Sequence, residues 1–79
     1  GSAVVRVFTP SKSANISKPL REKGFMVTDI KAKGRDGAVI ISWCIVPRRK
    51  LSKVLSIIRS VNPDAYVTTD LANPTSLRK

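Results

Sequence analysis

The sequence predicts an α+β fold in which two helices cover one face of a four-stranded antiparallel sheet. Three observations support this prediction. Four short stretches are rich in alternating apolar residues, as strands are. Two other stretches carry apolar residues at helical spacing and separate the first strand from the second and the third from the fourth. A Gly-Arg-Asp-Gly sequence at 34–37 marks a tight hairpin between the two middle strands.

The first half of the chain begins with a Val-rich strand at residues 3–8. We expect Ala3, Val5 and Val7 to face the core, because the alternate positions include a charged residue. A helix is predicted for residues 15–23, since Pro19 is tolerated only in a first helical turn and Gly24 is typical of a helix end.

The second half begins with a half-polar strand at 25–33, which is typical of a sheet edge. Residues 38–46 form the most apolar strand and are expected at the centre of the sheet. We expect its uniformly large apolar face to lie against the helices. That face comprises Val39, Ile41, Trp43 and Ile45.

A second helix is predicted for residues 48–60, because Leu51, Val54, Leu55 and Ile58 follow the helical template. Residues 65–71 form the last strand. The order β-α-β-β-α-β is that of a ferredoxin-like fold, with the first and third strands central. We expect one domain at residues 3–71, a cloning scar at 1–2 and a tail at 72–79.

The composition excludes most catalytic classes. The 79 residues include one Cys and no His. A disulfide within the chain, a zinc site built on cysteines and a His-activated nucleophile are therefore absent. The acidic residues are dispersed without paired spacing. We therefore predict a non-enzyme with no cofactor and no metal, and no apolar run is long enough for a membrane helix.

The net charge of +10 at pH 7 indicates an anionic partner or a strongly solvated surface. Two basic clusters are candidate anion-binding residues, although a solvated basic face remains the alternative for each. About 27–30 Å of strand separates them, so they form one site only if an oligomer joins them. The candidates are Lys31, Lys33 and Arg35 near the hairpin, and Arg48, Arg49 and Lys50 at the second helix.

The sheet face away from the helices is expected to be apolar and therefore to meet another protein surface, most simply a second copy of the chain. Phe8 and Tyr66 are also candidates for stacking on nucleic-acid bases, although the rest of that face is aliphatic. The predicted self-association residues are Val4, Phe8, Ile40, Val46 and Tyr66.

Four motifs resemble a known family when taken in order. They are Leu-Arg-Glu-Lys-Gly-Phe-Met-Val-Thr at 20–28, Gly-Arg-Asp-Gly at 34–37, the basic and apolar run at 48–58, and Asn-Pro-Asp-Ala-Tyr-Val at 62–67. Over residues 4–71 the chain resembles the bacterial domain of unknown function 2179. That domain forms the C-terminal part of uncharacterised integral membrane proteins, including the YitT-type proteins.

The resemblance implies a ferredoxin-like domain at the cytoplasmic face of the bacterial cell membrane, preceded by transmembrane helices absent from this sequence. It also implies a loose kinship of architecture with the PII-type signalling proteins, which are trimers. The resemblance carries no catalytic residue over to this chain. The leading hypothesis is a regulatory or sensory domain that self-associates and binds an anionic ligand, a nucleotide or a lipid head group. The alternatives are a nucleic-acid-binding module and a basic domain that associates with a membrane surface.

Overall fold

The computed structural model describes residues 1–72 and has the predicted order of elements. All four strands and the first helix begin and end within two residues of the predicted bounds, and the second α-helix begins three residues later than predicted. The elements are β1 (Ser2–Pro10), α1 (Ser17–Glu22), β2 (Val27–Gly34), β3 (Gly37–Pro47), the 3₁₀ turn η1 (Arg48–Lys50), α2 (Leu51–Val61) and β4 (Tyr66–Ala72).

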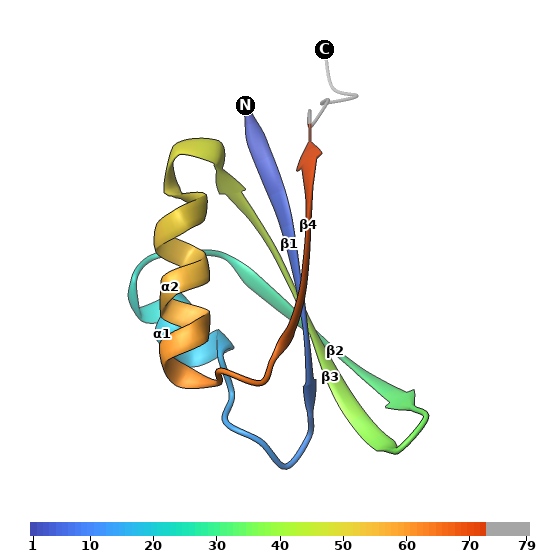
Figure 1. Ribbon diagram of the computed structural model, residues 1–79. Helices are drawn as coiled ribbons and strands as arrows, with labels where there is room; N and C mark the ends of the chain where they lie inside the picture. The colour runs from blue at the N-terminus through green and yellow to red at the C-terminus, as the bar shows by residue number, and fades with distance from the viewer. Residues whose placement is uncertain (73–79) are drawn as a thin grey trace.

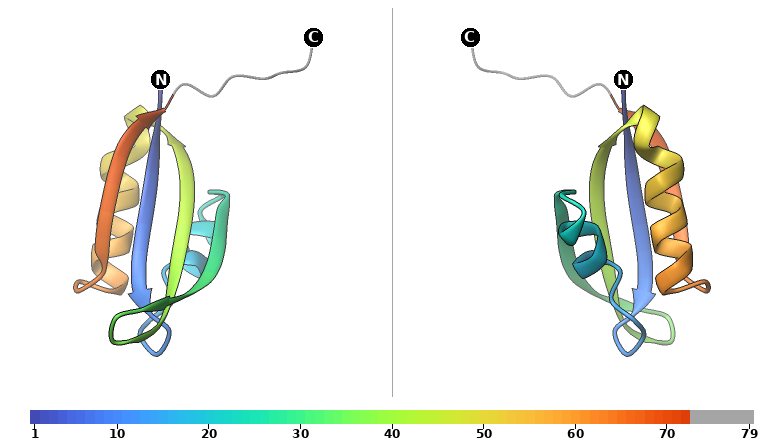
Figure 2. Two further views of the ribbon diagram at one scale, coloured as in Figure 1. Left: turned by 90° about the vertical axis from the view of Figure 1, so that its right-hand side faces the viewer. Right: turned by 90° about the vertical axis from the view of Figure 1, so that its left-hand side faces the viewer.

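The four strands form one antiparallel sheet in the order β2-β3-β1-β4. The first and third strands are central, as predicted for a ferredoxin-like fold. Both helices lie on the same face of the sheet, and Figure 2 shows this arrangement from its two sides. The opposite face carries no helix in the described part of the chain, and we call it the open face.

The core lies between the helices and one face of the sheet. Ala3, Val5 and Val7 of β1 are buried there, as the alternation of that strand predicted. Leu20 of α1 and Ile58 of α2 pack onto the same cluster. Because β1 is central and its alternate residues are fully buried, this strand organises the core.

The glycines at the turns lie where the sequence predicted turns. Asn15 lies before α1 instead of within the helix, and its Oδ1 accepts a hydrogen bond of 2.7 Å from the Ser17 N–H at the start of α1. Gly24 follows α1 with a φ of +90°, a backbone conformation that is unfavourable for residues other than glycine. Gly34 pairs with Gly37 across the β2–β3 hairpin, so the hairpin is confirmed.

Both ends of the domain differ slightly from the prediction. Ser2 belongs to β1, and the Gly1 carbonyl accepts a 3.0 Å hydrogen bond from the Arg48 N–H. Ala72 is the last residue of β4, while residues 73–79 of the predicted tail lie outside the described residues. The predicted helix at 48–60 begins with the 3₁₀ turn η1 and becomes an α-helix only at Leu51. None of the helices in the described segment has both the length and the apolar character needed to cross a bilayer.

Candidate interaction surface

The register of the strands determines which residues reach the open face. Residues directly opposite each other in an antiparallel pair point to the same side of the sheet. In β1, Val4 lies opposite Ile45, Arg6 opposite Trp43 and Phe8 opposite Ile41. Through the other pairs the open face extends to β2 and β4. Its apolar members are Val4, Phe8, Ile30, Val39, Ile41, Trp43, Ile45 and Tyr66.

The prediction for the two faces of β3 is therefore wrong. Val46 and Cys44 lie opposite Ala3 and Val5 and are buried beneath the helices. Ile40 lies opposite Thr9 and faces the same way. Ile40 and Val46 are thus removed from the predicted self-association residues, whereas Val4, Phe8 and Tyr66 stay on the open face.

The residues of β3 predicted to face the helices are on the open face instead, and the physical reason is the space available beneath α1. The α1 helix approaches the sheet so closely that the Ser17 and Ser42 hydroxyl oxygens are 3.1 Å apart. Only small side chains fit on β3 at that approach, and Ser42 and Cys44 provide them. The large Trp43 and Ile45 then point outward, with 40% and 50% of their surface exposed.

Arg6 is the only cationic residue at an open-face position within the four described strands. Its Nη1 atom donates a 2.8 Å hydrogen bond to Asp70 Oδ2, and the two side chains form an ion pair through this contact. The guanidinium carbon lies 5.0 Å from the centroid of a Trp43 ring. The charge of Arg6 is therefore neutralised within the face, and its guanidinium also makes a cation–π contact with Trp43.

A second aromatic group lies where β1 meets β4. The Phe8 and Tyr66 rings are 5.7 Å apart between centroids and tilted by 54°. Tyr66 is exposed over 67% of its surface. Aromatic residues and arginine are enriched among the residues that contribute most to protein interfaces, and the aromatic ones bury large areas with few rotatable bonds.

The two basic clusters lie at opposite ends of β3, because one surrounds the β2–β3 hairpin and the other follows Pro47. Figure 1 shows the hairpin at one end of β3 and the start of the α2 region at the other. Lys31 and Lys33 of β2 point to the helix side of the sheet, opposite Ile40 and Ala38, and Arg35 lies at the hairpin. We call these three residues the hairpin cluster. All of them are exposed.

Arg48, Arg49 and Lys50 make up η1, and we call them the η1 cluster. They are exposed at the end of the sheet where β1 begins, and the Lys50 Nζ atom lies 6.0 Å from the centroid of the Phe25 ring. A single chain therefore does not bring the two clusters into one pocket.

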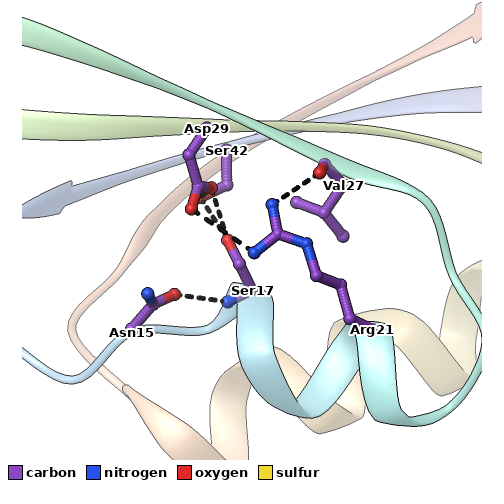
Figure 3. A network of polar contacts seen from close by, with 6 residues as sticks. All are labelled: Asn15, Ser17, Arg21, Val27, Asp29 and Ser42. Carbon is purple, nitrogen blue, oxygen red and sulfur yellow. Dashed lines mark hydrogen bonds and ion pairs between the residues drawn. The ribbon is translucent and has the colours of Figure 1, made fainter.

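A polar network beneath α1 was missed by the sequence reasoning (Figure 3). Asp29 Oδ1 accepts hydrogen bonds from the Ser17 hydroxyl and, at 2.7 Å, from the Ser42 hydroxyl. Both serines are fully buried. Arg21 donates to the Val27 carbonyl at 2.7 Å and lies 3.8 Å from Asp29 Oδ2. The network joins α1, β2 and β3 through residues that are far apart in the sequence, so no local sequence pattern predicts it.

Cys44 lies in the core beside these serines. Burial raises the pKa of the Cys44 thiol above its usual value by desolvating the thiolate. The thiol therefore stays protonated at neutral pH and is a poor nucleophile. In the described part of the chain, no three His, Cys, Asp or Glu side chains gather as a metal site would require.

The family model of uncharacterised proteins conserved in bacteria, DUF2179, matches residues 25–72, which is more than half of the chain. The chain belongs to the DUF2179 family. This confirms the family that the four sequence motifs predicted. The matched segment runs from just before β2 to the end of β4, and so includes most of the open face.

Relatives named UPF0316 proteins support the assignment to DUF2179. One from Oleidesulfovibrio alaskensis is 40% identical over 70 residues, covering 89% of this chain and 41% of the relative. One from Methanospirillum hungatei is 36% identical over 70 residues, covering 89% of this chain and 35% of the relative. The chain thus spans well under half the length of these curated relatives. None of these names indicates a catalytic family.

Solved structures share the fold of this DUF2179 domain. A functionally unknown protein from Pediococcus pentosaceus superposes with a TM-score of 0.86 at 14% identity, covering 95% of each chain. A DUF2179 protein from Eubacterium ventriosum gives a TM-score of 0.69 at 23% identity, covering 89% of this chain and 99% of the other. At these identities the likeness concerns the fold alone.

Proposed function

We propose that this DUF2179 domain is a non-catalytic regulatory or sensory module that joins copies of a longer protein through its open sheet face. The observation that carries the proposal is the combination on that face of exposed Trp43, Ile45 and Tyr66 with a single, internally paired cation. An apolar face whose charge is neutralised favours contact with another apolar surface. It favours a polyanion less, because the unpaired cations lie elsewhere.

The size of the open face supports this proposal. Four strands at about 4.8 Å spacing give a width of about 19 Å, and a nine-residue strand is about 30 Å long. The flat footprint is therefore about 550 Å² per copy, before side-chain relief is added. A stable interface buries about 600–1,000 Å² per partner, so the flat footprint of two packed open faces comes close to the lower limit of that range.

The test replaces Ile45 with lysine, which places a charge on an exposed apolar part of the proposed contact. We expect the unmodified domain to be dimeric or larger in sedimentation analysis and the Ile45→Lys variant to dissociate at least about tenfold more readily. Emission from Trp43, the only tryptophan, should shift to longer wavelength on dilution as its ring becomes solvated. Met26→Lys is the matched control, because Met26 is 85% exposed and lies outside the strands.

Two results would contradict self-association through the open face. The first is equal assembly of Ile45→Lys, Met26→Lys and the unmodified chain. The second is a monomer whose Trp43 emission is quenched by a single-stranded oligonucleotide and restored by salt, which would indicate the nucleic-acid alternative.

A second candidate function concerns the η1 cluster and a membrane surface. The specific observation is its position, because η1 directly follows β3, whose last residues pair with the start of β1, so three exposed cations lie beside that end of the sheet. We propose that this end of the domain faces anionic lipid head groups on the cytoplasmic side of a membrane. Each lysine or arginine close to such a surface contributes about 1 kcal/mol.

The lipid proposal is tested by co-sedimentation with vesicles. Changing Arg48, Arg49 and Lys50 to serine should lower partitioning onto vesicles with phosphatidylglycerol by about 100-fold. Changing Lys31, Lys33 and Arg35 to serine removes the same charge at the opposite end and should have a much smaller effect. Equal losses in the two variants would indicate unspecific attraction. Competition by a free nucleotide would instead identify a soluble phosphate ligand.

A further inference from the structure

The outer edge of β4 is an unprotected strand edge. The sheet order places β4 at one side, and no strand within residues 1–72 pairs with its outer edge. Such an edge presents free N–H and C=O groups, which proteins commonly protect with lysine or proline. The other edge strand, β2, carries Lys31 and Lys33, whereas β4 contains no lysine, proline or arginine.

A groove of about 390 Å³ runs beside this edge, between α2 and the first half of β4. Leu55 and Ile58 of α2 and Val67 of β4 provide its apolar lining, and Arg59 is exposed among the lining residues. Figure 2 shows α2 lying behind β4 and β1, with β4 at the margin of the sheet.

Leu71 lies on the same side of β4 as Val67 and Thr69, but beyond the groove at the other end of the strand. Its surface is 65% exposed, which is unusual for a leucine on the helix side of a sheet. The chain thus presents a groove with both polar and apolar lining near the start of β4 and an exposed apolar side chain near its end.

We infer that two copies of the chain pair antiparallel along β4, about a two-fold axis through Thr69, the middle residue of Tyr66–Ala72. In this register Leu71 lies directly opposite Val67 of the partner subunit, and the reverse contact follows from the symmetry. Each leucine then fills the groove of the other copy. The two sheets join into one continuous sheet with all helices on one face.

The same register is favourable on the open face. Asp70 of one copy lies opposite Thr68 of the partner, whose hydroxyl is 3.4 Å from Arg6 Nη1 in its own chain. Each Asp70 carboxylate therefore approaches the Arg6 of both copies. A register centred on Asp70 would place two carboxylates directly opposite each other, which is unfavourable.

This interface is independent of the open-face contact proposed above, because it uses the strand edge and the helix-side groove. The experiment therefore starts from the Ile45→Lys variant, in which the open-face contact is blocked. We expect this variant to remain a dimer at high concentration. Adding Leu71→Asp should raise the dissociation constant at least about tenfold, and adding Met26→Asp should not change it.

Cross-linking tests the register directly. Both chains carry Cys44→Ala, so that the introduced cysteine is the only thiol. Thr69→Cys places two cysteines face to face on the axis and should give a disulfide-linked dimer under mild oxidation. Thr68→Cys is the control, because its two copies are offset by about 8 Å, which is beyond disulfide reach.

An Ile45→Lys chain that is folded and monomeric at all concentrations would overturn the inference. Cross-linking through Thr68→Cys but not Thr69→Cys would overturn the register. Circular dichroism on every variant separates loss of pairing from loss of fold. Because the open-face proposal is tested in the unmodified background, each interface can fail without the other.

Discussion

Val46→Lys is expected to leave the domain unfolded, whereas the same replacement at the neighbouring Ile45 leaves it folded. Val46 is 1% exposed and faces Ala3 beneath the helices, while Ile45 lies on the open face. An unpaired ammonium group in that core costs several kcal/mol. A domain of this size has a free energy of unfolding of about 5–10 kcal/mol, so the buried lysine removes most of that stability.

Circular dichroism and thermal unfolding of the two variants provide the measurement. Val46→Ala serves as the control for lost packing alone and should stay folded, with a free energy of unfolding lowered by about 2 kcal/mol. If Val46→Lys folded as well as Ile45→Lys, the alternation of β3 described above would be incorrect.

Asp29→Ala is expected to lower the free energy of unfolding by about 2–4 kcal/mol. The carboxylate accepts hydrogen bonds from two buried hydroxyls, those of Ser17 and Ser42. Without it, each hydroxyl loses its charged acceptor, and an unsatisfied buried polar group costs about 1–3 kcal/mol. The ion pair with Arg21 contributes less, because the Arg21 side chain is half exposed and the two atoms are 3.8 Å apart.

Urea unfolding of three variants separates the network from simple packing. Asp29→Asn retains an acceptor oxygen and should recover part of the loss. A triple change of Asp29, Ser17 and Ser42 to alanine removes donors and acceptor together and should cost less than the sum of the single changes. Strictly additive losses would show that the three side chains do not act as a unit.

The order of elements, the hairpin and the helix ends could be predicted from the sequence because they depend on local chemistry. Gly24 and Gly37 take positive φ angles at the turns where glycine was expected. The buried face of β1 was also predictable, because the charged Arg6 indicates which face lies away from the core. These features each need only a few neighbouring residues.

The face of β3 was not predictable by the same reasoning, because neither side of that strand carries a charge. Side-chain size was then the only basis for the prediction, and the large Trp43 and Ile45 were therefore expected in the core. The decisive constraint is the close approach of α1 at Ser42, which depends on a helix far away in the sequence. The Asp29 network depends on the same kind of long-range geometry.

The central place of β1 in the sheet has a consequence for how the chain folds as it is synthesised. Phe8 pairs with Ile41 on one side and with Tyr66 on the other, so both neighbours of the first strand emerge long after it. Of the three strand pairs, only the β2–β3 hairpin is local. Folding dominated by such distant pairings is slow, because loop closure must precede the contacts that stabilise it. On the ribosome, the Val-rich first strand therefore has no partner until β3 has been made, and its β4 side stays unpaired until nearly the whole domain is complete.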